Sequence, residues 1–162
     1  MNAVEFLLAT FDDIQDHAFE STISALAEVS ENEVLWQHPA YREIEPEAGL
    51  PVPGTILWHV AHLEHCTRFY ANILRLRGSD QDPHVAPPAM LEWPGIADLF
   101  YDARRELREQ LALLSEDDLD AICYNGRTTG EFLRIIFRHE SWHGGQIAMI
   151  RRLCADKKNI EK

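Results

Sequence analysis

Residues 131–152, EFLRIIFRHESWHGGQIAMIRR, decide the fold because their apolar residues repeat with the period of an α-helix. At about 100° per residue, one stripe of this helix carries Phe132, Ile136, His139, His143, Ile147, Ile150 and Cys154. Histidines therefore stand where a helix that faces a core normally carries apolar residues. The four-residue spacing places the imidazoles of His139 and His143 one above the other. We expect both rings to point into the protein, within reach of a single ion.

Other segments show the same helical period. Residues 3–30 contain no Pro or Gly and predict a first helix, and residues 53–77 predict a second that stops at Gly78. Residues 94–114 predict a third helix, which starts at a proline. Residues 31–52 lack the period and contain several prolines, which indicates a long connection. We predict an all-α fold, a four-helix bundle with a long crossover between helices one and two.

The boundaries of the last helix are also predicted. Thr128 and Glu131 have the spacing of a capping box that starts it. One turn and a glycine-containing loop are expected between residues 115 and 129, and no segment of the chain alternates like a β-strand. The charged tail after Cys154 is expected to fray.

Composition limits the classes of function. The chain has 162 residues, which we expect to form one domain over residues 1–162, and its formal net charge is -12. An acidic chain has no basic surface for a phosphate backbone or an anionic membrane, so we expect neither nucleic acid nor membrane as a partner. The N-terminus does not have the pattern of a signal peptide. The 3 cysteines are odd in number and widely spaced, which predicts free thiols and a cytoplasmic location.

A third histidine, His59, lies on the apolar stripe of the second helix, in its first turn. Together with His139 and His143 it would form a three-imidazole set that suits zinc, nickel or iron and leaves a coordination position open, as catalytic sites do. The alternative is that the rings are hydrogen-bonded core residues, although burying them without a shared partner would cost about 1–3 kcal/mol for each unsatisfied nitrogen. His62, about 60° away from His59, could flank the site. Cys66 is expected to be a core residue, too far along its helix to bind the same ion.

Two features of the last helix allow more than one interpretation. Residues 139–143, HESWH, match the HExxH pattern of zinc metallopeptidases, but the third histidine of the extended pattern is replaced by Met149. A zinc hydrolase is therefore a minor alternative, and Glu140 is expected at the surface or beside a ligand. Gly144 and Gly145 leave the backbone after His143 bare, which fits either close helix packing or a substrate that approaches there.

These motifs resemble the DinB-like (DinB/YfiT) superfamily of four-helix-bundle proteins. The resemblance rests on ILWHVAHLEH in the second helix and on HESWHGGQIAMIRR, which is similar to the H-x-x-x-H-x-G-Q-I signature of the family. It covers nearly the whole chain, and the signature in the last helix is its most specific part. It implies a divalent metal ion, often nickel or zinc, held by residues that correspond to His59, His139 and His143. Members include transferases and a maleylpyruvate isomerase that use mycothiol, bacillithiol or glutathione, and many form dimers.

From this resemblance we expect a metal-dependent enzyme that acts on a small molecule, with a low-molecular-weight thiol as a candidate substrate. His62 and Gln146 are expected to surround the metal site, and Trp142 and Tyr70 are candidates for the pocket wall. A non-catalytic metal-binding or sensing bundle is the main alternative, and a protein ligand in the fourth position, with His62 the nearest candidate, would favour it. A bundle whose histidines bind nothing is a further alternative. A homodimer is expected from the family.

Overall fold

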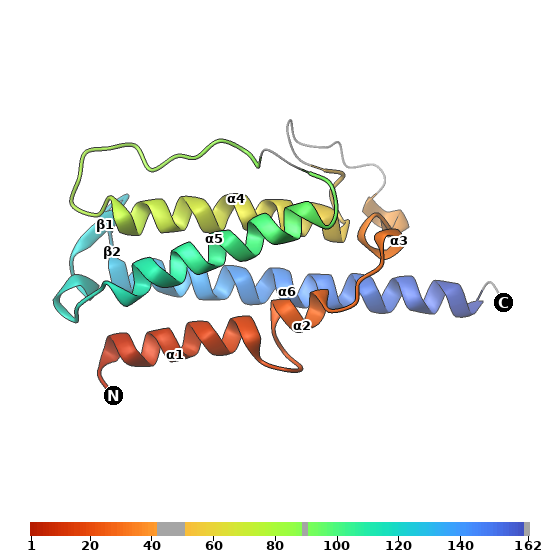
Figure 1. The fold of residues 1–162 in the computed structure, drawn as a ribbon, viewed down its shortest axis with the longest axis horizontal. Helices are drawn as coiled ribbons and strands as arrows, with labels where there is room; N and C mark the ends of the chain where they lie inside the picture. Colours follow the sequence, from red (N-terminus) through yellow and green to blue (C-terminus); the bar gives the residue numbers. More distant parts are fainter. Residues whose placement is uncertain (42–50, 89–90, 161–162) are drawn as a thin grey trace.

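The bundle consists of long helices that lie side by side in the computed structural model, which describes residues 1–41, 51–88 and 91–160 (Figure 1). Within these residues the long helices are α1 (Ala3–Asp16), α4 (Ile56–Arg75), α5 (Gly95–Ala112) and α6 (Thr129–Ile160). Shorter elements connect them: α2 (Thr22–Leu26), α3 (Glu31–Val34), η1 (Pro39–Tyr41), η2 (Asp117–Leu119), β1 (Ile122–Tyr124) and β2 (Arg127–Thr128). The predicted all-α class is confirmed. None of the helices in the described ranges is both long and apolar enough to cross a membrane.

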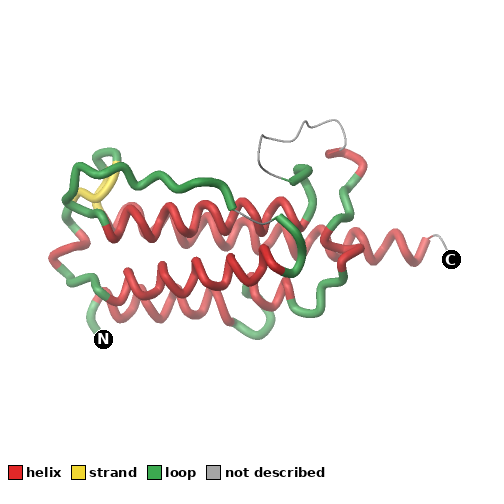
Figure 2. Tube along the Cα trace, turned by 45° about the horizontal axis from the view of Figure 1, so that its top comes forward, coloured by secondary structure: helices red, strands yellow, loops and turns green. Residues whose placement is uncertain are grey.

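The long connections follow from the directions of the helices. α1 and α6 run one way along the bundle, and α4 and α5 run the other way (Figure 1). Because α4 and α5 are parallel, the chain must return over the length of α4, about 30 Å for a helix of its size, before α5 can begin. The connecting loop does so beside α4 (Figure 2), where Arg68 Nη2 donates to the carbonyl of Ala86 at 2.9 Å and Asn72 Nδ2 donates to that of Pro83 at 3.1 Å.

The prediction of one helix over residues 3–30 is wrong. α1 ends at Asp16, and new short helices start after Ser21 and Ser30, each of which forms a capping box. Serine oxygens that accept from backbone N–H groups give the chain an alternative to a continuous helix. This competition interrupts the helix although the apolar period of the sequence continues. Glu28 adds a left-handed φ of 55°, which a continuous α-helix does not permit. Of the predicted crossover, residues 42–50 lie outside the described residues.

A short β-hairpin was not predicted. β1 and β2 pair in antiparallel fashion, joined by Asn125 and Gly126, whose φ values are 48° and 72°. Both residue types tolerate the left-handed region, which tight hairpin turns require. The strands are too short to show an alternating pattern, so only the Asn-Gly dipeptide indicates them in the sequence.

The last helix starts as predicted and ends later. Thr128 Oγ1 accepts from the backbone N–H of Glu131 at 3.2 Å, and the Glu131 carboxylate accepts from the N–H of Thr128 at 3.1 Å, which confirms the capping box. The helix continues to Ile160 instead of fraying after Cys154. No Pro or Gly interrupts residues 155–160, so nothing in the backbone opposes the extension.

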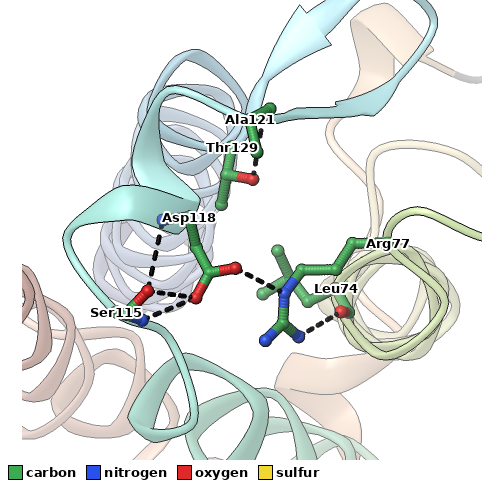
Figure 3. A network of polar contacts seen from close by, with 6 residues as sticks. All are labelled: Leu74, Arg77, Ser115, Asp118, Ala121 and Thr129. Carbon is green, nitrogen blue, oxygen red and sulfur yellow. Dashed lines mark hydrogen bonds and ion pairs between the residues drawn. The ribbon is translucent and has the colours of Figure 1, made fainter.

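A polar network fixes the end of the bundle from which α6 starts (Figure 3). The Asp118 carboxylate accepts from the N–H and the hydroxyl of Ser115, both at 2.7 Å, and from Arg77 Nε at 3.3 Å. The bonds from Ser115, followed by the contact with Arg77, lower the pKa of Asp118. Nearby, Thr129 Oγ1 donates to the carbonyl of Ala121 at 3.3 Å. The network holds the C-terminus of α4 against the turn that leads to α6.

The hydrophobic core is divided into two clusters along the bundle. One joins α2, α3 and the first half of α4 to the start of α5 and the second half of α6, and includes Val60, Phe100 and Ile147. The other joins α1 to the remaining halves of the same helices, and includes Leu74, Leu107 and Leu133. Residues 64–70 of α4 and 137–146 of α6 contribute no buried member to either cluster. A more polar layer therefore separates the two apolar clusters.

On one side of this layer, a buried ion pair joins α5 to α6. Arg104 Nη2 lies 2.5 Å from Glu140 Oε1, and these side chains are only 3% and 5% exposed. Gln15 of α1 and Thr22 of α2 approach the same carboxylate, so four helices meet at this pair.

The two glycines after His143 differ in their surroundings. A Cβ atom on Gly144 would lie 2.8 Å from Thr22 Oγ1, whereas one on Gly145 would meet nothing within 4 Å. Gly144 therefore allows α2 to approach α6 closely. Close helix packing explains Gly144, and it does not explain Gly145.

We predict strong coupling between Arg104 and Glu140. Arg104→Met leaves a buried carboxylate without its cation and should lower the free energy of unfolding by about 3–5 kcal/mol. The double variant Arg104→Met/Glu140→Leu leaves no unpaired charge and should lose less than the sum of the two single variants. Urea denaturation of the wild type and the three variants measures the coupling. Strictly additive losses would show that the pair is not coupled.

Candidate metal centre

The candidate site lies where α4 and α6 face each other between the two apolar clusters. Thr55 caps α4, its hydroxyl accepting from the N–H of Trp58 at 3.1 Å, and this start places His59 in the first turn as predicted. Later residues of α4 and the histidines of α6 bring further donors to the same layer. Because the two helices are antiparallel, the first turns of α4 meet the middle of α6 (Figure 1).

Four imidazoles form a continuous series of contacts across this layer. His59 Nδ1 lies 2.8 Å from His143 Nδ1, and His143 Nε2 lies 3.1 Å from His139 Nε2. His139 Nε2 in turn lies 3.1 Å from His62 Nε2. The structure therefore brings together the three histidines predicted as ligands, and His62 joins them as expected for a residue that surrounds the site.

Cys66 belongs to the same cluster, so the expectation of a core residue remote from the ion is wrong. Its Sγ lies 3.6 Å from His62 Nε2, one turn earlier on α4. Donor atoms of His62, Cys66 and His139 all lie within 4.8 Å of one another, the arrangement of a possible metal site. Cys66 is indeed about two turns from His59 along α4. His62 lies between them, and its contact with Cys66 extends the cluster by one turn.

These distances can be compared with those around a tetrahedral zinc ion. Zinc–nitrogen and zinc–sulfur bonds of usual length separate neighbouring ligands by about 3.3 Å for two nitrogens and about 3.6 Å for nitrogen and sulfur. The contacts of His62 with His139 and with Cys66, at 3.1 and 3.6 Å, are close to these values. These two contacts of His62 fit a divalent metal ion, and the third pair of donors, Cys66 and His139, lies within 4.8 Å.

The set His59, His139 and His143 is arranged differently. His143 contacts His59 through Nδ1 and His139 through Nε2, and an ion can bind only one of these nitrogens. A rotation of His59 or His143 is needed before all three rings can meet one ion. The assignment of His59, His139 and His143 as the metal ligands therefore stays a prediction.

Aromatic neighbours hold two of the rings. The hydroxyl of Tyr70 lies 3.3 Å from His139 Nδ1, which leaves Nε2 of this ring directed at the cluster. Such a partner on the second nitrogen is the usual way in which proteins orient a metal-binding imidazole. The indole of Trp58 stacks on His62, with ring centroids 5.1 Å apart and an angle of 6° between the planes.

Burial keeps His59, His139 and His143 neutral near pH 7. It lowers the pKa of His59 to about 4, with a further contribution from His62, and that of His139 to about 4 for the same two reasons. Burial and the neighbouring histidines lower the pKa of His143 to about 3. Burial also raises the pKa of the Cys66 thiol to about 11. In the metal-free protein the rings thus carry lone pairs that can bind a cation.

One end of the cluster borders a pocket of about 510 Å³. His59 and His143 form part of its wall, and Gln146 and Trp142, both expected near the site, line it as well. Apolar side chains provide most of the remaining wall: Tyr41, Pro53, Met149, Ile150 and Leu153. A small molecule in this pocket would lie against two of the imidazoles.

Glu140 points to another part of the bundle. It is 4% exposed and pairs with Arg104 of α5. The expectation that Glu140 lies at the surface or beside a metal ligand is therefore wrong. Neighbouring residues of a helix point about 100° apart, and the glutamate therefore leaves the face that His139 occupies. The glutamate of a zinc hydrolase must reach the water that it activates, and this geometry gives that alternative no support.

We predict that acid destabilises the metal-free protein through these histidines. Their pKa values are lowered on folding, so the unfolded chain binds more protons between pH 6.5, the ordinary value, and about 4. The free energy of unfolding should therefore fall as the pH is lowered through this window. Urea denaturation of chelator-treated protein measures it. His143→Gln should show a shallower dependence than the wild type and than the exposed control His17→Gln, and equal slopes would contradict the prediction.

The chain was compared with known protein families, curated proteins and solved structures. Nothing matches it among the curated proteins or among the solved structures. A sequence profile described as DinB superfamily matches residues 14–147, which include every residue of the cluster. This match spans most of the chain and agrees with the helical architecture and with the histidines of α4 and α6. The chain belongs to the DinB superfamily.

Proposed function

We propose that this protein is a metal-dependent enzyme that acts on a small molecule, of the thiol-dependent transferase or isomerase type. The observation that carries the proposal is the contact between the imidazole cluster and the pocket of about 510 Å³, whose wall includes His59 and His143. In this proposal nickel or zinc is held by His59, His139 and His143, and His62 lies beside them. A bound divalent ion would supply a Lewis acid that polarises a carbonyl oxygen or holds a thiolate.

The residues of the pocket support binding of a partly apolar substrate. Met149, Ile150 and Leu153 offer an apolar wall that would exclude water from the reacting groups. The amide of Gln146 can donate to and accept from a polar group and would orient it. Trp142 is 65% exposed at the pocket, so its indole can cover a bound molecule from the solvent side.

The cellular setting is part of the proposal. Cys66, Cys123 and Cys154 are all free, which is consistent with a reducing cytoplasm where low-molecular-weight thiols are abundant. We propose a cytoplasmic protein with a thiol as co-substrate, and a homodimer as the family suggests. Nucleic acid and membrane remain disfavoured as partners by the net charge of -12.

A second candidate function is a non-catalytic metal-binding or sensing bundle. A specific observation favours it, because His62 and Cys66 add protein donors to the cluster and could fill the positions that an enzyme leaves open. Metal sites that protein ligands fill completely are typically structural. The two functions differ in whether a small thiol can reach the ion.

We predict near-stoichiometric metal in the wild type and its loss in His143→Ala. The protein is purified without a tag, dialysed against a weak chelator, reloaded with zinc or nickel and measured by elemental analysis. His65→Ala is the control, because His65 is a histidine of α4 that contacts the carbonyl of Val85 outside the cluster. The helical circular dichroism should persist in both variants. Absence of metal from the wild type under every loading condition would remove the proposal.

A further inference from the structure

The pocket beside His59 and His143 differs from the rest of the protein in its lack of charge. Charged residues make up 26% of the chain, yet none of the described residues that line this pocket is Asp, Glu, Lys or Arg. Its wall is built mostly from apolar and aromatic side chains, among them Trp58, Trp142 and Met149. Large apolar side chains gathered around a hollow are typical of a ligand site.

A second hollow shows that the lack of charge is particular to this pocket. A groove of about 780 Å³ runs beside α2 and α6, and its wall includes Asp13, Glu20, Glu33, Arg151 and Arg152. A ligand with ionised groups would find partners of both signs in that groove. In the pocket beside the histidines, the described residues offer it no charged partner.

The pocket is also long, and its polar groups are neutral. From His143 the wall continues along α6 to Leu153, about 15 Å further at about 1.5 Å per residue. Gln146, one turn after His143, adds an amide, which is uncharged. The carbonyls of Tyr41 and Pro53 already accept from Gln37 Nε2, at 3.1 and 2.8 Å. The far part of the pocket therefore suits an apolar body better than a polar one.

We propose that this pocket takes an uncharged, largely apolar substrate, while the ionised part of the thiol stays in water. The inference rests on the proposed function, because it assigns a substrate class to the same pocket. Glutathione and bacillithiol carry several ionised groups, and moving such groups against an apolar wall without a partner is costly. The apolar body of the substrate lies along α6, with its polar end at His59 and His143. Only the sulfur of the thiol has to reach the histidines.

The test compares a pair of fluorescent probes that share one ring system. N-phenyl-1-naphthylamine is uncharged, and 8-anilinonaphthalene-1-sulfonate carries a sulfonate. Each is titrated into the chelator-treated full-length protein, so that the sulfonate meets no metal ion, and the fluorescence gives the dissociation constant. We predict that the wild type binds the uncharged probe at least about tenfold more tightly, because the sulfonate loses water without gaining a partner.

A cation placed in the wall should weaken this preference. Met149 is 53% exposed, so Met149→Lys adds a charge without burying it. Its attraction to the sulfonate should shift the ratio of the two dissociation constants by at least about tenfold toward the anionic probe. Met149→Leu changes shape alone and should keep the wild-type ratio. Phe6→Lys is the matched control and should also keep it, because Phe6 is 57% exposed on α1, which contributes no residue to this pocket.

Three outcomes would overturn the inference. They are the absence of saturable binding of the uncharged probe, equal or tighter binding of the anionic probe to the wild type, and the same ratio in Met149→Lys as in Phe6→Lys. The titration needs no ion, so any of these results would leave the metal-dependent function to be decided by elemental analysis. Conversely, a wild type without metal that still prefers the uncharged probe would remove that function and keep the ligand class of the pocket.

Discussion

The packing of α4 against α6 depends on the requirement that buried ring nitrogens find partners. An unsatisfied buried polar group costs about 1–3 kcal/mol, and the layer between the apolar clusters contains several imidazoles. The structure meets this requirement by placing the rings against one another, from His59 through His143 and His139 to His62. Such an arrangement works only for one register of the two helices. The polar layer therefore specifies how α4 and α6 meet, while the apolar clusters provide most of the driving force.

The other side of α6 is held by charge. The ion pair of Arg104 and Glu140 fixes α6 against α5 at the same level of the bundle as the imidazoles. His139 and Glu140 are neighbours in sequence, so one turn of α6 is held from two directions by contacts of different kinds. A cluster that must gather several donor atoms benefits from this rigidity, because metal ligands need positions fixed to within a fraction of an ångström.

The sequence predicted the features that depend on a sustained period. The helices that became α4, α5 and α6, and the inward direction of His139 and His143, followed from apolar spacing over many residues. The breaks after Asp16 and before Thr22 were missed because they depend on serine side chains that cap new helices, a local competition that an apolar period does not reveal. Cys66 was predicted to lie outside the cluster because only its distance from His59 was considered. His62, which lies between these two residues on α4, was left out. The partner of Glu140 could not be predicted, since the contact joins helices that are distant in sequence.

The division of the core has a consequence for how the bundle opens. Each apolar cluster joins segments from several helices, and the layer between them holds the imidazoles and the buried ion pair. Proteins open in contiguous cooperative units, and a break in the apolar core is a place where one such unit can end. We therefore expect the two ends of the metal-free bundle to open as separate units, with amide hydrogen exchange that differs between them. An ion bound in the layer would join these units. Unfolding of the metal-bound protein would then be cooperative along the whole length of the bundle.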